Sequence, residues 1–285
     1  MKFTNRYNLP EHFCRWLESD DYDYQPGVIS TTTLLKPARA WALMQRHRDE
    51  LQMDYSDLIA IRYGSALHDS LEKASAFGGN VVEQRFFAEV SGRTISGKFD
   101  AIIDGVIWDN KSTSVWKFVN GEFDDYVKQL SVYRFILAQN GITVADYGMI
   151  AFLFTDWKKS DALKGGNYPP LRLQTKRIEL MTLDETREFI DGRVMEFGFA
   201  LSVLPECTPE ELWAQPERFA VYKTAKALRA TRVYETRQEA DKLAAEIGGV
   251  VQHRPGKVKR CGYCQAAPFC EQCQKMREAG LIDEP

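Results

Sequence analysis

Apolar residues recur along the chain with two spacings, and each spacing predicts a different kind of element. Apolar residues three or four positions apart predict helices, and short apolar runs between turn residues predict strands. The predicted helices cover 30–44, 61–77, 123–140 and 182–201. The predicted strands lie near 81–90, 94–103, 106–111, 145–157 and 171–180. Because residues 149–154 are almost continuously apolar, we expect their strand inside a sheet, and the whole pattern predicts an α/β fold.

Polar residues indicate where several helices begin and where a second module starts. Ser30 can cap the helix over 30–44, and Thr182 with Glu185 forms a capping-box pattern. A proline-containing connector near residue 204 leads to a short strand at 232–235, a helix after Thr236 and a strand at 250–253. We therefore expect a core with an N-terminal helical region over 1–204 and a small module over 205–285.

The segment GKFDAIIDGVIWDNK carries the first candidate chemistry. Its Asp104-Gly105 pair predicts a hairpin, so Asp100 and Asp109 end up on adjacent strands with Lys111 two residues further on. Paired carboxylates with open coordination positions suit a divalent cation that assists phosphodiester hydrolysis. A lysine on the same strand face can orient the attacking water and offset charge at phosphorus. An ordinary hairpin with solvated charges gives the same pattern, so this motif alone does not decide.

Candidate partners for this hairpin lie on both sides of it in the sequence. His68, four residues after Gly64 on the preceding helix, is a possible third metal ligand, although lone histidines on helices more often serve packing. Glu83 at the start of the intervening strand can contact a metal through water or be an exposed strand residue. Gln129 and Tyr133 lie at i and i+4, so both project from one helix face toward a phosphate, the lysine or the core.

The six cysteines are unevenly spread, which indicates metal binding rather than disulfides in a reducing compartment. Four of them fall within thirteen residues, and the other two stand apart. The clustered residues are Cys261, Cys264, Cys270 and Cys273, and the separate ones are Cys14 and Cys207. Thiolates at the spacing of the cluster can surround one metal centre, either zinc or iron–sulfur.

Composition limits the classes of protein that the chain can represent. With 285 residues, 44% of them hydrophobic, it can bury one substantial core and a smaller appendage. It contains neither a run of 18 apolar residues nor an apolar signal core, so we expect no membrane contact and a cytoplasmic location. The net charge is −3, yet residues 219–275 hold 11 Lys/Arg and 5 Asp/Glu. Such a local excess suits nucleic acid, with Trp213, Tyr222, Tyr234 and Tyr263 available to stack on bases, although a solvated basic face is also consistent with it.

Taken in order, the candidate residues resemble the PD-(D/E)xK nuclease superfamily and its RecB-like branch, which includes recombination nucleases and CRISPR adaptation nucleases. The resemblance covers about residues 30–155. It rests on Gly64-x-x-x-His68, Glu83, Gly97-x-x-Asp100, Asp109-x-Lys111 and Gln129-x-x-x-Tyr133. The segments ISTTTLLKPARAWALMQRH and HRPGKVKRCGYCQAAPFC also resemble RecB-type exonucleases of bacteriophages.

The resemblance implies a restriction-endonuclease-like core, in which a central mixed sheet is flanked by helices, and a set of site residues. One or two Mg²⁺ or Mn²⁺ ions would be bound by His68, Asp100, Asp109 and the carbonyl of Asn110. Lys111 would position the water and stabilise the transition state, while Gln129 and Tyr133 would organise the lysine and the DNA backbone. Asp109 stands where glutamate is commoner.

The resemblance also implies a 4Fe-4S cluster bound by Cys261, Cys264, Cys270 and one distant cysteine. In relatives that fourth ligand precedes the core, near the segment corresponding to KPARAWAL, where this chain has no cysteine. We expect Cys207 to replace it, with Cys273 as the alternative and Cys14 third. If Cys273 is the ligand, the site is compact and equally suited to Zn²⁺.

The sequence thus predicts a metal-dependent DNA exonuclease, a hydrolase used in phage-type DNA recombination, replication or repair and located in the cytoplasm of a bacterial host if a phage encodes it. Two alternatives remain, a non-catalytic DNA-binding adaptor and a structure- or sequence-directed endonuclease of the same superfamily. Since the chain has no helicase P-loop, unwinding would require a separate helicase or recombinase partner.

Overall fold

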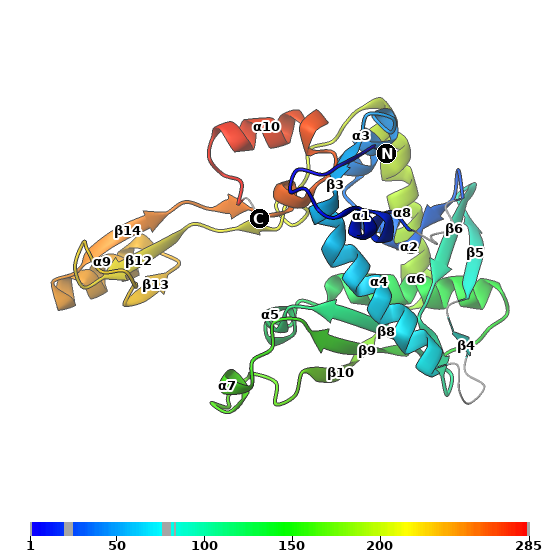
Figure 1. Cartoon of the computed structure of the whole chain (residues 1–285), viewed down its shortest axis with the longest axis horizontal. Helices are drawn as coiled ribbons and strands as arrows, with labels where there is room; N and C mark the ends of the chain where they lie inside the picture. Colours follow the sequence, from blue (N-terminus) through cyan, green and yellow to red (C-terminus); the bar gives the residue numbers. More distant parts are fainter. Residues whose placement is uncertain (1, 20–24, 76–80, 83, 284–285) are drawn as a thin grey trace. The chain divides into compact units, whose positions relative to one another are not determined.

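The computed structural model describes residues 2–19, 25–75, 81–82 and 84–283 and divides the chain into two compact units. The first unit comprises Met1–Lys36 and Gln52–Phe199, and the second comprises Pro37–Leu51 and Ala200–Pro285. Both combine helices with strands (Figure 1), as the sequence predicts. The structure places residues 37–51 in the second unit, whereas the boundary expected from the sequence, after residue 204, places them in the core.

A five-stranded mixed sheet forms the centre of the first unit. Its strand order is β10-β9-β8-β7-β4, with β8 and β9 parallel and the remaining pairs antiparallel. The bounds are β4 Val81–Val82, β7 Ala101–Ile103, β8 Val106–Thr113, β9 Tyr147–Phe154 and β10 Leu173–Glu179. The apolar strand β9 has a neighbour on each side, which confirms its predicted interior position.

The hairpin between β7 and β8 is the one predicted from Asp104-Gly105. Ile103 pairs with Val106, and the two turn residues have φ angles of 52° and 74°. Both residues are therefore in the left-handed region that a two-residue hairpin requires. The single strand predicted over 94–103 is wrong, however, because the chain changes sheets at Phe99 and Asp100. Its first part, β6 Arg93–Lys98, belongs to a second sheet of order β2-β6-β5, with β2 Ile29–Ser30 and β5 Arg85–Val90.

Helix α6, Asp124–Gln139, connects the two sheets of the first unit. It contacts β5 and β6 as well as β8 and β10, and its buried residues join those of β9 in the main core. This core comprises Phe99, Ile107, Val115, Tyr126, Leu130, Tyr133, Leu137, Ile150, Phe152, Phe154 and Ile178. A Cβ at Gly148 would lie 2.9 Å from Leu130 Cδ1, so α6 lies close to β9.

The other helices of the first unit agree with the sequence to different degrees. Helix α4, Tyr55–Ser75, begins six residues before its predicted start, and its predicted end lies outside the described residues. Helix α8, Leu183–Ser202, has the predicted capping box, since Glu185 N–H donates to Thr182 Oγ1 and Thr182 N–H donates to Glu185. In the first unit, the elements that the sequence did not predict are β1 Lys2–Thr4, α1 Glu11–Glu18, β2 Ile29–Ser30, β3 Gln52–Asp54, α5 Val115–Val119 and α7 Lys159–Ala162.

The single helix predicted over 30–44 is wrong. Ser30 does cap a helix, because Thr33 N–H donates to its Oγ at 3.2 Å, but this helix, α2, covers only Thr31–Leu34. A second helix, α3, begins at Ala38 and ends at Arg46. Pro37 explains the break, since proline has no N–H to donate and disfavours helical backbone at the residue before it.

The second unit contains a three-stranded antiparallel sheet covered on one face by a helix. Its strand order is β13-β12-β14, and α9 contacts all three strands (Figure 1). The bounds are β12 Arg218–Tyr222, β13 Arg232–Tyr234, α9 Arg237–Ile247 and β14 Val250–Arg254. The sequence predicted all of these elements except β12. Gly248, with a φ of 63°, ends α9 as expected for a C-terminal glycine.

The remainder of the second unit surrounds the clustered cysteines. Two short strands, β11 Ala214–Gln215 and β15 Lys257–Val258, pair ahead of two 3₁₀ turns, Arg260–Tyr263 and Ala267–Phe269. Helix α10, Glu271–Glu278, follows them. Among the described helices of the chain, none is long and apolar enough to cross a membrane.

Candidate functional site

A cavity of about 770 Å³ in the first unit brings the predicted catalytic residues together. They come from helix α4, from the link between β6 and β7, from β8 and from α6. The predicted residues that line the cavity are His68, Asp100, Asp109, Lys111, Gln129 and Tyr133. Gly64, on the same helix as His68, lies against β8, where a Cβ would be 3.4 Å from Ser112 Oγ.

Asp109 and Lys111 form an ion pair in which the aspartate is buried and the lysine is partly exposed. Both point to the same face of β8, and Lys111 Nζ lies 2.5 Å from Asp109 Oδ2. Asp109 is only 2% exposed, and burial raises the pKa of its carboxyl although the Lys111 ammonium opposes that shift. Among the described residues, no donor other than this ammonium reaches the buried Oδ2. A buried carboxylate oxygen in this condition is a suitable ligand for a cation.

Asp100 is held between His68 and the backbone of Asn110. His68 Nδ1 lies 3.3 Å from Asp100 Oδ1, and Asn110 N–H donates to Oδ2 at 2.6 Å. Burial raises the pKa of Asp100, but the hydrogen bond and charge of His68 with the Asn110 N–H outweigh it, so the pKa is lowered. The same hydrogen bond outweighs the burial of the imidazole and raises the pKa of His68 above its usual 6.5.

Gln129 and Tyr133 contact one another as their i and i+4 positions predict. Gln129 Nε2 donates to Tyr133 Oη at 2.8 Å, and both side chains are buried. Gly97 sets the place of the tyrosine ring, because a Cβ there would lie 2.8 Å from Tyr133 Cδ1 and 3.0 Å from Ile136 Cδ1. The glycine of the predicted Gly97-x-x-Asp100 motif therefore allows α6 to lie close to β6.

The cavity also has residues that the sequence did not indicate. Arg62, Arg85 and Lys98 add positive charge to its lining, and Trp16 adds a half-exposed aromatic ring. Arg85 and Lys98 are register partners in the β5–β6 hairpin. The sequence does contain a signal for them. If the two strands are paired about the turn at Gly92, Arg85 lies opposite Lys98, which is two residues before Asp100. Glu83 lies outside the described residues.

The cavity residues fit a divalent cation by their chemistry, with two carboxylates and an imidazole. In the described part of the chain, no three His, Cys, Asp or Glu side chains are placed so that they could hold a metal ion as they stand. The carboxylates are instead paired with His68 and Lys111.

Five cysteines line a second, smaller cavity of about 30 Å³ in the second unit. They are Cys207, Cys261, Cys264, Cys270 and Cys273. The structure thus brings the separate Cys207 to the cluster. Gln272 holds it there, accepting from Cys207 N–H at 2.9 Å and donating to Cys207 O at 3.1 Å. Cys14 lies in the first unit, where Asn5 Nδ2 donates to its Sγ.

All six cysteines are free thiols in this structure. Burial first, and then nearby Glu211 and Cys270, raise the pKa of Cys207 to about 12. Burial and the neighbouring Cys273 likewise raise the pKa of Cys261 to about 12. Thiols with such values are protonated at neutral pH, so a metal that binds them must displace their protons.

Sequence comparison identifies the family. The sequence profile described as "PD-(D/E)XK nuclease superfamily" matches residues 33–271. The chain belongs to the PD-(D/E)XK nuclease superfamily. This membership confirms the superfamily that the ordered residues predicted, whereas the RecB-like branch stays a prediction. No curated protein matches this PD-(D/E)XK chain.

Solved structures show distant similarity to this PD-(D/E)XK chain. SSO0001 is 16% identical with a TM-score of 0.46, and the match covers 64% of this chain and 83% of SSO0001. An alkaline exonuclease from Laribacter hongkongensis, LHK-Exo, is 12% identical with a TM-score of 0.34, covering 62% of this chain and 91% of LHK-Exo. LHK-Exo in complex with dAMP gives 13% identity with the same TM-score and coverage.

Proposed function

We propose that this PD-(D/E)XK protein is a metal-dependent DNA exonuclease. The observation that supports the proposal is the convergence of Asp100, Asp109, Lys111 and His68 on one cavity, where the buried Asp109 carboxylate faces the Lys111 ammonium. Two carboxylates beside a lysine match the needs of phosphodiester hydrolysis better than those of a purely structural ion pair.

His68, Asp100, Asp109 and the carbonyl oxygen of Asn110 are the residues that would hold Mg²⁺ or Mn²⁺. A bound cation would lower the pKa of a water and polarise the phosphate. Replacing the His68–Asp100 and Lys111–Asp109 pairings with contacts to a cation would release the Lys111 ammonium. Lys111 would then orient the attacking water and offset negative charge at phosphorus. Water adds to phosphorus as the bond to the leaving oxygen breaks, and that oxygen departs with a proton.

The other cavity residues would position the DNA backbone. The Gln129 amide and the Tyr133 hydroxyl, already joined by a hydrogen bond, would hold the lysine and a phosphate. Arg85 and Lys98 would bind phosphates next to the cleaved bond, since guanidinium and ammonium groups form the stronger, charge-assisted hydrogen bonds to phosphate.

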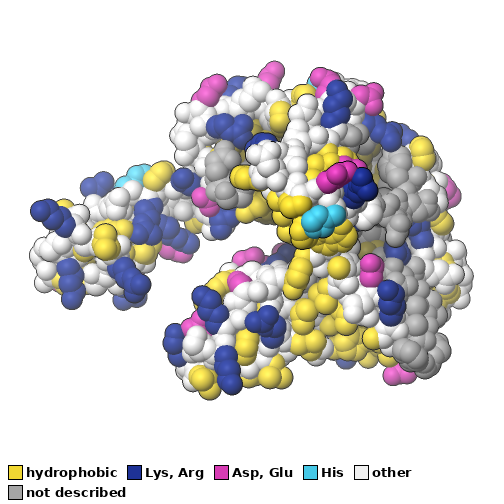
Figure 2. Space-filling view, viewed as in Figure 1, with side chains coloured by type: hydrophobic (Ala, Val, Ile, Leu, Met, Phe, Trp, Pro, Cys, Tyr) yellow, Lys and Arg dark blue, Asp and Glu magenta, His cyan; other side chains and the backbone are white. Residues whose placement is uncertain are grey.

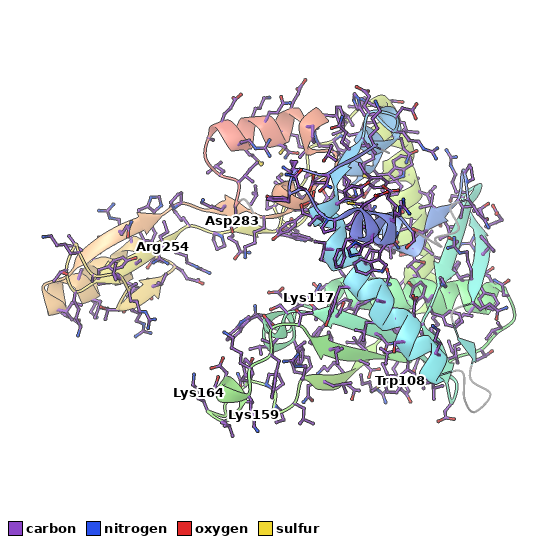
Figure 3. The ribbon with its side chains drawn as sticks, in the orientation of Figure 1. Trp108, Lys117, Lys159, Lys164, Arg254 and Asp283 are labelled. Atoms are coloured by element: carbon purple, nitrogen blue, oxygen red, sulfur yellow. The ribbon has the colours of Figure 1, made fainter. Side chains whose placement is uncertain are left out.

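Replacing Lys111 tests the assignment. Lys111→Ala should fold normally and lower the cleavage rate of linear DNA by about 10²- to 10³-fold or more, the usual loss when a transition-state charge partner is removed. Lys117→Ala is the matched control. Both lysines lie over the Tyr126 ring, Lys111 at 5.7 Å and Lys117 (Figure 3) at 4.5 Å from its centroid, but Lys117 does not line the cavity. A Lys111→Ala protein that cleaves at the wild-type rate refutes the site.

A substrate panel separates the exonuclease from its two alternatives. The protein is incubated with Mg²⁺ and linear duplex DNA, closed circular DNA, single-stranded DNA or RNA, with Asp109→Ala as the inactive control. Loss of linear DNA from its ends supports the exonuclease. Cutting of circles indicates an endonuclease, and absence of cleavage with retained binding indicates a DNA-binding adaptor.

We also propose that the cysteine cavity holds a metal centre bound by Cys207, Cys261, Cys264 and Cys270, with Cys273 as the alternative fourth ligand. Five sulfurs lining one cavity support this proposal. A brown protein with visible iron–sulfur absorption would indicate a 4Fe-4S cluster, and stoichiometric zinc without iron would indicate Zn²⁺. Comparing Cys207→Ser with Cys273→Ser identifies the fourth ligand, and Cys14→Ser, in the other unit, serves as the control.

The resemblance of residues 29–47 and 253–270 to phage RecB-type exonucleases supports a role in phage-type recombination, replication or repair. A separate helicase or recombinase would supply single strands to such an enzyme. Measuring the loss of duplex DNA with and without a purified helicase tests this partnership.

A further inference from the structure

An arginine from helix α3 reaches the cysteine cavity of the second unit. Arg39 is 7% exposed, and its Nε–H donates to Cys270 Sγ at 3.1 Å. Its Nη1 donates to the carbonyl of Pro205 at 3.1 Å. A buried side chain thus joins segment 37–51 to the cysteines, and the two bonded residues are 231 positions apart in the sequence.

The charge of this guanidinium lacks a carboxylate partner. Among the described residues, no Asp or Glu lies within 4.0 Å of Arg39, and its hydrogen bonds go to one sulfur and one backbone carbonyl. Glu211, the acid that lines the same cavity, accepts from the N–H of Thr208. A buried cation is costly without a compensating negative charge.

Metal binding would supply the missing negative charge. Four thiolates around Zn²⁺ carry a net charge of about −2, and a four-cysteine iron–sulfur cluster is also anionic. An N–H donor on a ligand sulfur stabilises the thiolate and fixes its orientation, as outer-shell donors do at other metal centres.

We propose that Arg39 is a positioning residue of the cysteine metal centre. Its guanidinium holds Cys270 in place as a thiolate ligand and offsets the negative charge of the ligand set. The inference rests on the proposed cysteine centre and is independent of the nuclease site. It also explains why α3 packs within the second unit, where Leu43 joins the cluster of buried cysteines.

The test measures how fast the purified full-length protein loses its metal to an excess of chelator. Arg39→Gln should release metal about 10- to 100-fold faster than wild type, the usual effect of removing an outer-shell partner. Arg39→Lys keeps the positive charge but not the fixed Nε–H donor, so its release rate should lie between the two. If Arg39→Gln and Arg39→Lys both release metal at the wild-type rate, the inference is wrong.

Arg46→Gln is the matched control. Arg46 ends the same helix and donates to the carbonyls of Ala200 and Leu201, so its loss weakens α3 without touching a sulfur. Its metal-release rate should match wild type. Equal acceleration in Arg39→Gln and Arg46→Gln would show that α3 packing alone matters and would overturn the inference.

A second readout depends on the metal found. For an iron–sulfur cluster, Arg39→Gln should lower the midpoint potential, because hydrogen bonds to ligand sulfur favour the reduced state. For zinc, alkylation of Cys270 in the metal-loaded protein should be faster in Arg39→Gln than in Arg46→Gln, and equal rates would contradict the inference. Wild-type protein purified with neither metal would refute the cysteine centre and this inference together. The nuclease proposal would be unaffected, since Lys111→Ala tests it separately.

Discussion

At the scale of single residues, the candidate active site contains charges that neutralise one another. His68 pairs with Asp100 and Lys111 pairs with Asp109, so each carboxylate already has a positive partner. A divalent cation would compete with both pairings for the same oxygens. Metal binding in this cavity should therefore depend on the protonation of His68 as well as on the carboxylates.

We predict that Mg²⁺ binding and cleavage both strengthen as the pH rises past the pKa of His68. Hydrogen bonding to Asp100 raises this pKa above 6.5, so the imidazole stays protonated to higher pH than usual and its nitrogen is blocked until the proton leaves. The Mg²⁺ concentration for half-maximal cleavage should fall as the pH rises above 6.5 and the imidazole loses its proton. In His68→Gln this dependence should largely disappear. A wild-type Mg²⁺ requirement that stays constant as the pH rises would contradict a ligand role for His68.

At both candidate sites, the sequence predicted the residues that converge better than it predicted their supporting partners. Asp100, Asp109, Lys111 and Gln129 with Tyr133 follow from hairpin chemistry and helical spacing, which are local. Arg39 was missed because its contact to Cys270 depends on a fold that joins distant segments. No period or motif marks such a contact in a single sequence.

At the scale of elements, the close packing of α6 on β6 depends on Gly97. We predict that Gly97→Ala lowers the free energy of unfolding by about 1–3 kcal/mol, the usual cost of overpacking, because its Cβ would lie 2.8 Å from the Tyr133 ring. Cleavage should fall as well, since Tyr133 lines the cavity. Urea unfolding and cleavage rates check both effects.

The control for this prediction is another glycine-to-alanine change. Gly192 lies within α8, and a Cβ there would meet nothing within 4 Å. Gly192→Ala should leave stability unchanged or raise it by up to about 1 kcal/mol, since alanine is the better helix former. Equal losses in the two variants would show that glycine flexibility, rather than the contact of α6 with β6, explains the effect.

A second prediction at this scale concerns Asp54, which joins β3 to its surroundings. Its carboxylate accepts from Thr4 Oγ1, Arg6 N–H, and both the N–H and Oγ of Ser56. Although burial raises the pKa of Asp54, these hydrogen bonds outweigh it and hold the pKa well below 3.8. The stabilisation that the Asp54 carboxylate gives the folded protein is therefore complete above the unfolded-state pKa of about 3.9. It is lost as the pH falls through the lower folded-state pKa.

Asp54→Asn should cost about 2 kcal/mol at neutral pH and reduce the loss of stability below about pH 4, because hydrogen bonds to a charged group are among the stronger ones. Urea unfolding at several pH values measures both. Glu188→Gln, which changes an exposed acid on α8, should keep the wild-type pH dependence. An Asp54→Asn protein whose acid sensitivity equals that of wild type would contradict the role of this carboxylate.

Some elements fixed by local chemistry were predicted, whereas the change of sheet, which is fixed by distant pairing, was not. The Asp104-Gly105 hairpin and the capping box of α8 follow from a few adjacent residues. The change of sheet between β6 and β7 depends on β2 and β4, which lie far away in sequence. Pro37 is a local signal for a helix break. Because helical apolar spacing continues on both sides of it, the sequence was nevertheless interpreted as one helix over 30–44.

At the scale of the whole molecule, the chain consists of two units that each bury their own core. The first unit centres on α6 and the mixed sheet, and the second combines the cysteine cluster with a small core beneath α9. The membership of residues 37–51 in the second unit could not be read from composition, because helix α3 has the ordinary apolar spacing of a core helix.

The second unit carries the local excess of positive charge, and its distribution leads to the last prediction. Lys and Arg side chains gather over the β12–β14 sheet and α9 (Figure 2), and Arg254 on β14 (Figure 3) is exposed. Lys257 and Lys259 follow Arg254 within residues 251–270, a stretch of sequence that contains no Asp or Glu. Arg237 and Lys242 instead lie on α9 with Glu239, Asp241 and Glu246, and Arg237 pairs with Asp241 at 3.5 Å.

We predict that Lys257→Gln with Lys259→Gln weakens DNA binding and reduces the slope of log affinity against log salt by about 0.7–0.9 for each lysine that contacts a phosphate. Arg237→Gln with Lys242→Gln removes the same charge but should leave the slope near wild type, because neighbouring acids already oppose those cations. Affinity for a fixed oligonucleotide measured at several salt concentrations, in a cleavage-inactive Asp109→Ala background, gives both slopes. An equal reduction in the two variants would indicate a general effect of net charge. Two unchanged slopes would show that none of these four cations contacts DNA and would direct the search to others, such as the cavity cations Arg85 and Lys98.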